Sequence, residues 1–505
     1  MWVRAAGLSA LSLVGCAQVF GLDPTTGGTP DAPGGPPIAT LQFDRLSVGT
    51  TMQRAPADLT GMPATFMVPD ATAPNGMQTF TTALAGTKDR WNGEVPEGVV
   101  PMVEFTLPEA TPLRRLYAFN ARTTLGLFGQ YEHQNPTTAP AGGAFQASLT
   151  LPSQYTGELI RLYAVGPWVY HDYPATDLPA PNIGATAVGP TTIAYDTAHW
   201  ASLVGPRTPP AVTAADQIVA LRYTAGTSDL TAAGPVTPFT ATGGTDPFSA
   251  ALATVTHAAL DVHIQPNTAA TRLNMTSPAN PTLSMAWSVV AAPAWQYGNN
   301  TGPVLQSLGV VQTDTGNIIT PYGNPFEGLG WKSLFTWNAT KARTYTPMGQ
   351  TLVMTLHSGI YEVAEPTAGT TLDLPAGLPV LVSINKTPLT SDGLTVTIDP
   401  ATAVELALVA DKPTATFYQF NIYEIVPNTA VPPNALDYKI VYAAYSVSST
   451  VMIPHDVLVA GKLYTIRAHC IQGGYPMIST GNLQERGLPL SVGYLDSGVF
   501  TVAAP

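Results

Sequence analysis

The sequence predicts an all-β fold of tandem β-sandwich domains, and three features of the chain indicate it. Its 505 residues include 45 Gly and 48 Pro, which form turns and interrupt long helices. Short apolar or alternating runs recur along it, such as "LIRLYAV", "LPVLVSI" and "LTVTI". Turn signals such as Pro74-Asn75-Gly76 and Gly243-Gly244 separate these runs at the short spacing typical of sandwiches. The length is sufficient for about two to four domains, each with its own core.

Residues 1–15 are typical of an export signal. Arg4 precedes an apolar run that is too short to cross a bilayer as a helix. The run ends in Leu13-Val14-Gly15-Cys16, which resembles the lipobox of bacterial lipoproteins. This resemblance implies that Cys16 is the mature N-terminus and carries lipid, with palmitate among its acyl chains, as a membrane anchor. An ordinary secretory signal with an incidental cysteine is the alternative.

The segment that follows indicates a tether and a destination. Residues 16–40 are rich in Pro and Gly, so after the lipidated cysteine we expect a semi-extended spacer with no core. The stretch "CAQVFGLD" resembles the start of lipoproteins from myxobacteria-like species. Ala17, where Asp would retain a lipoprotein in the inner membrane, resembles the outer-membrane sorting rule of enteric bacteria. Together these resemblances imply an outer-membrane lipoprotein of the cell envelope.

The body of the chain divides into three expected segments. Residues 41–180 are predicted to form an N-terminal β-sandwich that ends in a Pro-rich stretch, residues 186–385 a middle β-rich region, and residues 386–505 a C-terminal β-sandwich. Pro247 to Ala258 is the one helix candidate, although its Thr and Val residues weaken it. Asp392-Gly393 between two apolar runs predicts a β-hairpin.

A stretch near the C-terminus, "IPHDVLVAGKLYTIRAHC", resembles the E–F corner of fibronectin type III domains. Leu458, Ala460-Gly461 and Tyr464 take the places of the leucine, the turn and the corner tyrosine. The resemblance implies a C-terminal fold of the immunoglobulin/fibronectin type, in which the Tyr464 ring fills the core edge and its hydroxyl bonds a turn backbone group. A simple hairpin that contains a tyrosine is the alternative.

Strand alternation after Tyr464 predicts which side chains face the core. Ile466, Ala468 and Cys470 should point inward with Tyr464, whereas Thr465, Arg467 and His469 should point outward. Cys470 is therefore expected to be a small buried hydrophobe rather than a reactive thiol. An upstream stretch, "LPSQYTGELIRLYAVG", is a weaker copy of the corner, with Gly157 in the place of Gly461 and Ile160 in the place of Tyr464.

Charge and motifs exclude several classes of function. The net charge is −12, the isoelectric point is near 5, and no basic cluster occurs, so neither nucleic acid nor an anionic membrane surface is an expected partner. No G-x-S-x-G, phosphate-binding or H-E-x-x-H motif occurs. On a strand His257, Asp261 and His263 would share one face, but the two histidines would lie roughly 20 Å apart, too far for one metal ion. On a helix His257 and Asp261 would be neighbours, but His263 would turn away. We expect no catalytic residues, no metal and no cofactor.

Two aromatic groups are candidates for ligand contact. Trp331, Ser333, Phe335 and Trp337 would share one face of a strand and either stack on sugars or, as favoured, form core. The second group is a predicted recognition loop, for which a self-packed loop is the alternative; it contains Trp168, Tyr170, His171, Asp172 and Tyr173.

Two functions remain. The first is a non-enzymatic binding or structural module that is held in the envelope by its N-terminal lipid and binds a polysaccharide or another envelope protein. The second is the accessory carbohydrate-binding part of an extracellular hydrolase, or a hydrolase whose dispersed site the sequence does not reveal.

Overall fold

The computed structural model confirms the all-β fold. It describes residues 37–48, 52–107, 112–133, 143–165, 169–173, 183–194, 200–202, 212–224, 229–256, 258–265, 269, 272–273, 283–293, 302–308, 316–346, 352–374, 376–427 and 436–503. Cys16 and the expected export signal of residues 1–15 lie outside these residues. None of the helical segments in the described part is long and apolar enough to span a membrane.

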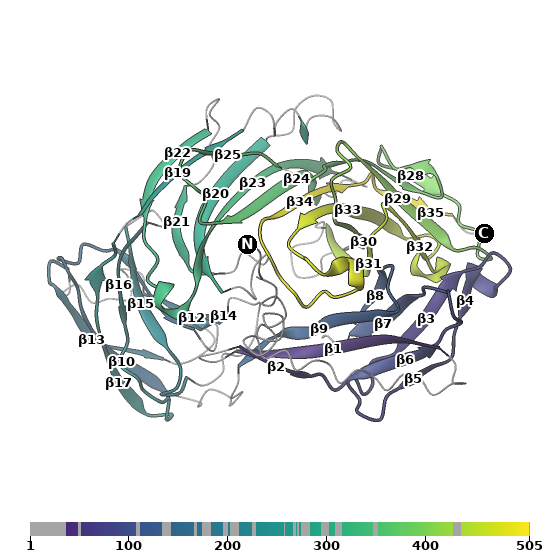
Figure 1. The fold of residues 1–505 in the computed structure, drawn as a ribbon. Coiled ribbons are helices and arrows are strands. Elements are labelled where there is room, and N and C mark those ends of the chain that lie inside the picture. The colour runs from purple at the N-terminus through teal and green to yellow at the C-terminus, as the bar shows by residue number, and fades with distance from the viewer. Residues whose placement is uncertain are drawn as a thin grey trace, which may run out of the picture.

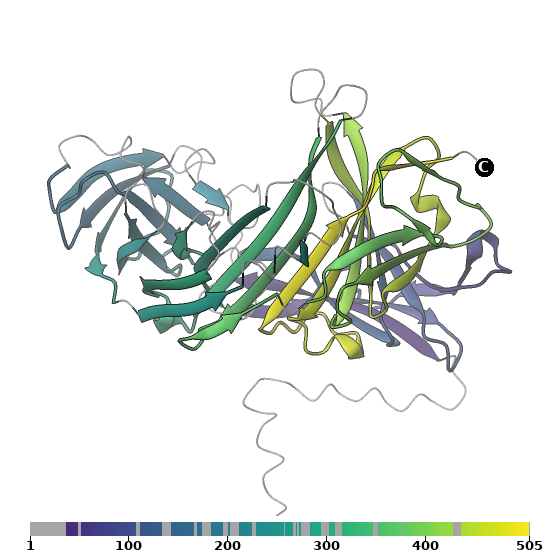
Figure 2. The same cartoon turned by 90° about the horizontal axis from the view of Figure 1, so that it is seen from above.

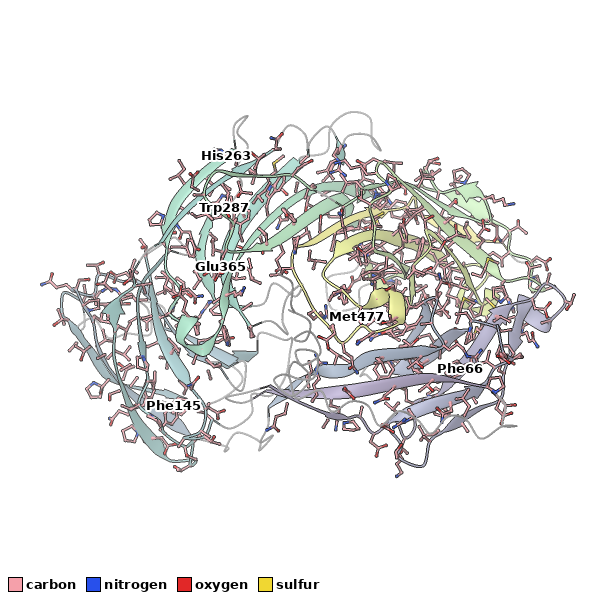
Figure 3. The ribbon with its side chains drawn as sticks, viewed as in Figure 1. Phe66, Phe145, His263, Trp287, Glu365 and Met477 are labelled. Atoms are coloured by element: carbon pink, nitrogen blue, oxygen red, sulfur yellow. The ribbon has the colours of Figure 1, made fainter. Side chains whose placement is uncertain are left out.

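The described strands form four β-sandwiches, each around its own apolar core. In the first sandwich, one sheet contains β1 (Ile38–Val48), β2 (Met52–Pro56), β5 (Thr82–Leu84), β6 (Arg90–Glu94) and β9 (Thr123–His133). The opposing strands are β3 (Ala64–Pro69), β4 (Met77–Thr79), β7 (Met102–Leu107) and β8 (Leu113–Ala118). Phe66, labelled in Figure 3, is 1% exposed in the core between them.

The second sandwich lies at one end of the molecule (Figures 1 and 2). One sheet contains β10 (Ala144–Thr150), β13 (Ala187–Ala194) and β17 (Thr245–Ala251). The other contains β11 (Leu159–Ala164), β12 (Val169–Tyr173), β14 (Trp200–Ser202), β15 (Ile218–Tyr223), β16 (Leu230–Pro235) and β18 (Ala253–Thr254). Because β10 pairs with β13 and β11 pairs with β15, the boundary expected between residues 180 and 186 falls inside this sandwich.

The helix candidate at Pro247 to Ala258 is wrong. Residues of this stretch form β17 and β18, and β17 pairs with β10 in parallel. Phe248 and Ala250 are buried while Ser249 and Ala251 are exposed, so burial alternates from one residue to the next, as in a β-strand. Pro247 is tolerated because β17 is an edge strand of its sheet.

The third and fourth sandwiches follow in sequence. The third places β19 (Ala258–Ile264), β22 (Gly316–Tyr322) and β25 (Thr370–Leu372) against β20 (Leu283–Ala292), β21 (Val304–Leu308), β23 (Lys332–Tyr345) and β24 (Leu352–Ala364). The fourth places β26 (Pro379–Ile384), β27 (Thr387–Pro388), β29 (Val404–Ala410) and β32 (Thr450–Ile453) against β30 (Phe417–Pro427), β31 (Leu436–Ser446), β33 (Leu463–Gly473) and β34 (Leu490–Asp496). The fourth sandwich begins at β26, a few residues before the expected boundary at 386.

The hairpin expected at Asp392-Gly393 is also wrong. The tight turn is at Asn385-Lys386, whose φ angles of 46° and 65° are those of a type I′ turn, and it joins β26 to β27. Asp392-Gly393 instead leads into β28 (Leu394–Val396), which pairs in parallel with β35 (Phe500–Val502). The Asp392 carboxylate accepts a hydrogen bond from the Val499 N–H at 2.8 Å, which ties this turn to β35.

One 14-stranded sheet joins the first, third and fourth sandwiches. β24 pairs with β34 across the junction of the third and fourth sandwiches, and β8 pairs with β31 across that of the first and fourth. Figure 1 shows this sheet as an arch, with the smaller sheets of the third and fourth sandwiches on its outer side. We call the opposite side of β30, β31, β33 and β34 the inner face.

Polar side chains reinforce these junctions. Arg114 of β8 bonds Glu104 of β7 at 2.9 Å and Asp456 of the fourth sandwich at 2.9 Å, and the Tyr442 hydroxyl donates to Glu104 at 2.8 Å. Arg272 bonds Asp411 at 2.7 Å between the third and fourth sandwiches. Since charged partners on both sides would be left unpaired by separation, the three sandwiches are expected to behave as one body.

Candidate functional site

The corner expected around Tyr464 is present in the fourth sandwich. The Tyr464 ring is 1% exposed, and its hydroxyl accepts a hydrogen bond from the Val459 N–H at 3.0 Å. Gly461 has a φ of 80°, and its N–H donates to the Val502 carbonyl at 2.9 Å. Leu458 is buried beside them. The predicted role of Tyr464, a core-filling ring with a hydroxyl on a turn backbone group, is confirmed.

The upstream copy also has a corner tyrosine, which the sequence reasoning missed. Tyr155 is fully buried, and its hydroxyl donates to the Glu158 carbonyl at 3.0 Å beside Gly157, whose φ is 106°. Ile160 occupies the position after the glycine at which the corner tyrosine was expected. Tyr155 lies before the glycine instead, and its ring is buried in the core of the second sandwich.

The expected recognition loop is a strand. Val169 to Tyr173 form β12, which is paired on both sides by β11 and β14. Tyr170 lies opposite Tyr163 and Ala201 in these two ladders. The prediction of a loop is therefore wrong for Tyr170, His171, Asp172 and Tyr173, because the β-forming residues of this stretch outweigh the flanking prolines. Trp168 lies outside the described residues.

The other sequence candidates are the aromatic row from Trp331 to Trp337 and the group of His257, Asp261 and His263. Trp331, Ser333, Phe335 and Trp337 are at most 7% exposed, which confirms the core interpretation of this row. Asp261 and His263 lie in β19, and His257 is outside the described residues. No group of three metal-ligating side chains occurs within the described ranges.

A cluster of polar and aromatic side chains occupies the inner face of the fourth sandwich. Arg467 of β33 lies opposite Asn421 of β30 and Asp496 of β34. One step along, His469 lies opposite Gln419 and Tyr494. Directly opposed residues in antiparallel strands point to the same side of a sheet, so these side chains project together. The expected outward orientation of Arg467 and His469 is confirmed, whereas Thr465, also expected outward, is buried and donates to the Ser497 carbonyl at 3.0 Å.

Three tyrosines surround the guanidinium of Arg467. Its central carbon lies 4.8 Å from the ring centroid of Tyr494, 5.3 Å from that of Tyr423 and 5.9 Å from that of Tyr438. Tyr423 and Tyr438 meet edge to face with centroids 5.0 Å apart. All three tyrosines are partly exposed. We call Tyr423, Tyr438 and Tyr494, with Arg467 at their centre, the tyrosine face.

Arg467, Asp496 and His469 at the tyrosine face all have shifted pKa values. Burial alone would lower the pKa of Arg467, but its hydrogen bonds to Asp496 and the charge of that carboxylate raise it above its ordinary value. Burial raises the pKa of Asp496, and its hydrogen bonds from Arg467 and the charge of Arg467 oppose that rise. These hydrogen bonds hold the guanidinium in place over the rings. Burial and then the positive charge of Arg467 lower the pKa of His469 to about 3. His469 is therefore neutral near pH 7 and unsuited to general acid–base catalysis there.

The arrangement suits binding. Fixed aromatic rings offer contact area with little side-chain entropy to lose, and the partly exposed Gln419 adds an amide group beside them, whereas Asn421 is buried. The Asn421 side chain is itself positioned by the Gln419 amide at 2.9 Å and by His469 Nε2 at 3.4 Å. Strand alternation in the sequence predicts that Arg467 and His469 face outward. The three tyrosines belong to strands whose positions in the sheet the sequence does not reveal.

Comparisons with known proteins add little. No family model matches the chain, and no curated protein matches it. Among solved structures, the chain is similar to the pilus adhesin SpaC of Lactobacillus rhamnosus GG in its open conformation, at 10% identity. That alignment covers 92% of this chain and 56% of the adhesin, with a TM-score of 0.12, which is too low to carry an argument. Fold and site alone define the class: a β-sandwich array with an aromatic, polar inner face.

Proposed function

We propose that this chain is a lipid-anchored protein of the bacterial outer membrane that binds a partner through its tyrosine face and catalyses no reaction. The observation that carries the proposal is the Arg467–Asp496 pair set among three partly exposed tyrosines. Such a set combines aromatic contact area with directional hydrogen bonding, which is how binding surfaces concentrate affinity.

The fold supports a display role. The 14-stranded sheet holds β30, β31, β33 and β34 between two further sandwiches, so the face is presented on a braced surface rather than on a mobile loop. The spacer of residues 16–40 would give this body reach from the lipid on Cys16. Net charge −12 and 21 Lys and Arg among 505 residues oppose binding to nucleic acid.

The partner is a polysaccharide or another envelope protein, since both offer ring or side-chain surfaces that pack on tyrosine. The accessory carbohydrate-binding part of an extracellular hydrolase is the second candidate function. The observation that favours it is the exposure of the tyrosine rings beside amides and a guanidinium, which together match the apolar faces and hydroxyl edges of sugars.

A binding screen tests the proposal. The full-length chain is applied to a glycan array and to purified envelope proteins, and compared with the Tyr423→Ala, Tyr494→Ala variant. A Tyr322→Ala variant is the control, because Tyr322 is a partly exposed tyrosine on the outer sheet of the third sandwich. Retention by wild type and control, with loss by the double variant, supports the proposal. Turnover of ester, peptide or glycoside substrates that is lost on removal of a specific carboxylate or histidine would contradict the absence of chemistry.

A further inference from the structure

A row of polar and aromatic side chains crosses the inner face from the tyrosine face towards the first sandwich. Tyr494 lies opposite His469 in the ladder of β33 and β34. Gln419 lies opposite His469 on one side and opposite Tyr445 on the other. All four side chains are partly exposed. Neighbouring strands are about 4.8 Å apart, so the row extends over roughly 14 Å, and a ligand that contacts both tyrosines is longer than one sugar ring.

An arginine lies at the far end of this row. Burial raises the pKa of Tyr445, and the positive charge of Arg486 is among the charges that oppose this rise, so the two groups are near each other. The Arg486 guanidinium carbon is 4.6 Å from the ring centroid of Tyr475, and Nη1 donates to the Tyr475 hydroxyl. Tyr475 packs edge to face on Phe417 of β30 with centroids 5.0 Å apart. Phe417 shares the face of Gln419, two residues further on, so this stack fixes the guanidinium at the end of the row.

Arg486 is a cation without a carboxylate partner. Most arginines in the described part of the chain bond a carboxylate, as Arg467 bonds Asp496. Arg486 bonds none among the described residues, where the hydrogen bond of Nη1 to Tyr475 is the one that its guanidinium makes. Nε is buried and unpaired, whereas Nη2 is unpaired but not buried. The exposed donor at Nη2 is therefore open to an anionic group from outside the chain.

The negative net charge of the chain does not oppose an anion at this position. At physiological ionic strength, exposed charges more than about 8 Å apart are largely screened, so the groups beside Arg486 decide. The carboxylate next to it in sequence, Glu485, bonds Arg54 at 3.2 Å and is thereby compensated. Hydrogen bonds between ionised groups are also stronger than those between neutral ones.

The arrangement of the row distinguishes a saccharide from a peptide. β30, β31, β33 and β34 are each paired on both sides, so this face offers no strand edge to which an extended peptide could add. Sugar rings instead stack on tyrosine rings, and their hydroxyls bond amides such as that of Gln419. Building on the proposed function, we propose that the ligand of the tyrosine face is an acidic polysaccharide, a linear chain of sugar rings that crosses the strands from Tyr494 to Tyr445 and places a carboxylate on Arg486 Nη2.

The test compares one glycan in two charge states. Calorimetry measures binding of the full-length chain to oligogalacturonate and to its carboxyl-reduced form, in which each carboxylate is reduced to a hydroxymethyl group. We expect the acidic form to bind at least tenfold more tightly, and added salt to remove that difference, because salt screens partly exposed ion pairs. Equal affinity for the two forms, or no binding of either, would overturn the inference. Binding of polyglutamate as tight as that of oligogalacturonate would overturn the saccharide class.

A variant tests the arginine itself. Arg486→Gln removes the charge and keeps an amide beside Tyr475, so affinity for the acidic form should fall at least tenfold while affinity for the reduced form stays the same. Lys386→Gln is the matched control, because it makes the same change in net charge at an exposed turn between β26 and β27, on the other sheet of the fourth sandwich. This control should bind as wild type does. Unchanged affinity of folded Arg486→Gln for the acidic form would overturn the inference.

Failure of this inference and failure of the proposed function give different results. If the two glycan forms bind wild type equally and the Tyr423→Ala, Tyr494→Ala variant binds neither, the tyrosine face is a binding site whose ligand is not selected by charge. If that folded variant binds both forms as wild type does, the proposed function is wrong, and this inference is overturned with it.

Discussion

Asp496 accepts two hydrogen bonds from Arg467, from Nε at 2.6 Å and from Nη2 at 2.9 Å, on the face of the sheet opposite Tyr464. The Asp496 side chain is 2% exposed and that of Arg467 15% exposed. A charge pair so nearly removed from water is stable only while both members are present. It fixes the guanidinium around which the tyrosine face is assembled.

Removal of one member of this pair should lower the free energy of unfolding strongly, whereas removal of both members should lower it much less. Arg467→Met leaves Asp496 buried and unpaired, which we expect to reduce the free energy of unfolding by about 3–5 kcal/mol. The double variant Arg467→Met, Asp496→Leu should recover most of that loss. Denaturant melts of the full-length chain measure both, and a double variant no more stable than the single one would contradict this account.

Tyr464→Phe tests the corner. The substitution removes the hydroxyl that accepts the Val459 N–H and leaves the buried ring in place. Val459 is 49% exposed, so water can partly replace the lost acceptor, and we expect a loss of about 1 kcal/mol in the free energy of unfolding. A value below about 0.5 kcal/mol would mean that the hydroxyl contributes nothing to the corner.

His469 should make stability depend on pH. Its pKa is about 3 in the folded chain, whereas the ordinary value is 6.5. Between these values the unfolded chain binds one more proton at this residue than the folded chain, so the free energy of unfolding falls as pH drops from about 6.5 towards 3. His469→Gln should show a shallower slope between about pH 5 and 6.5, where few carboxylates titrate. Equal slopes in urea melts of the two proteins would contradict the lowered pKa of His469.

Cys16 is the predicted site of lipid attachment. Replacement by Ser removes the thiol that would be acylated, so Cys16→Ser should abolish metabolic labelling with palmitate and release the chain from membranes. Cys470→Ser is the matched control, because Cys470 is fully buried and burial raises the pKa of its thiol to about 12. Labelling that persists in Cys16→Ser would exclude this anchor.

The sequence was sufficient for local features that depend on the period of a strand. The buried orientation of Cys470 and the corner at Tyr464 follow from alternation and turn residues over about ten positions. The order of the strands in the sheets could not be predicted from the sequence, because pairs such as β8 with β31 join residues far apart in the chain. For the same reason the tyrosine face was not foreseen: Tyr423, Tyr438 and Tyr494 belong to three strands that only the fold makes neighbours of Arg467.

The misassigned segments also have physical causes. Val169 to Tyr173 was expected to be a loop because prolines flank it, but pairing on both sides by β11 and β14 outweighed that signal. At Asn385-Lys386 the turn uses two residues with positive φ and no glycine, so the glycine of Asp392-Gly393 was the more visible but incorrect indication.

The most direct test of the central claim, that this chain acts by binding through the tyrosine face, is an equilibrium titration of the glycan or envelope protein that wild type retains best. Calorimetry compares the full-length chain with its Tyr423→Ala, Tyr494→Ala variant, after circular dichroism has verified that both are folded. If the two rings are central contacts worth about 2 kcal/mol or more, affinity should fall about 30-fold or further, while Tyr322→Ala binds as wild type does. Equal affinity of the folded double variant and wild type would contradict the claim.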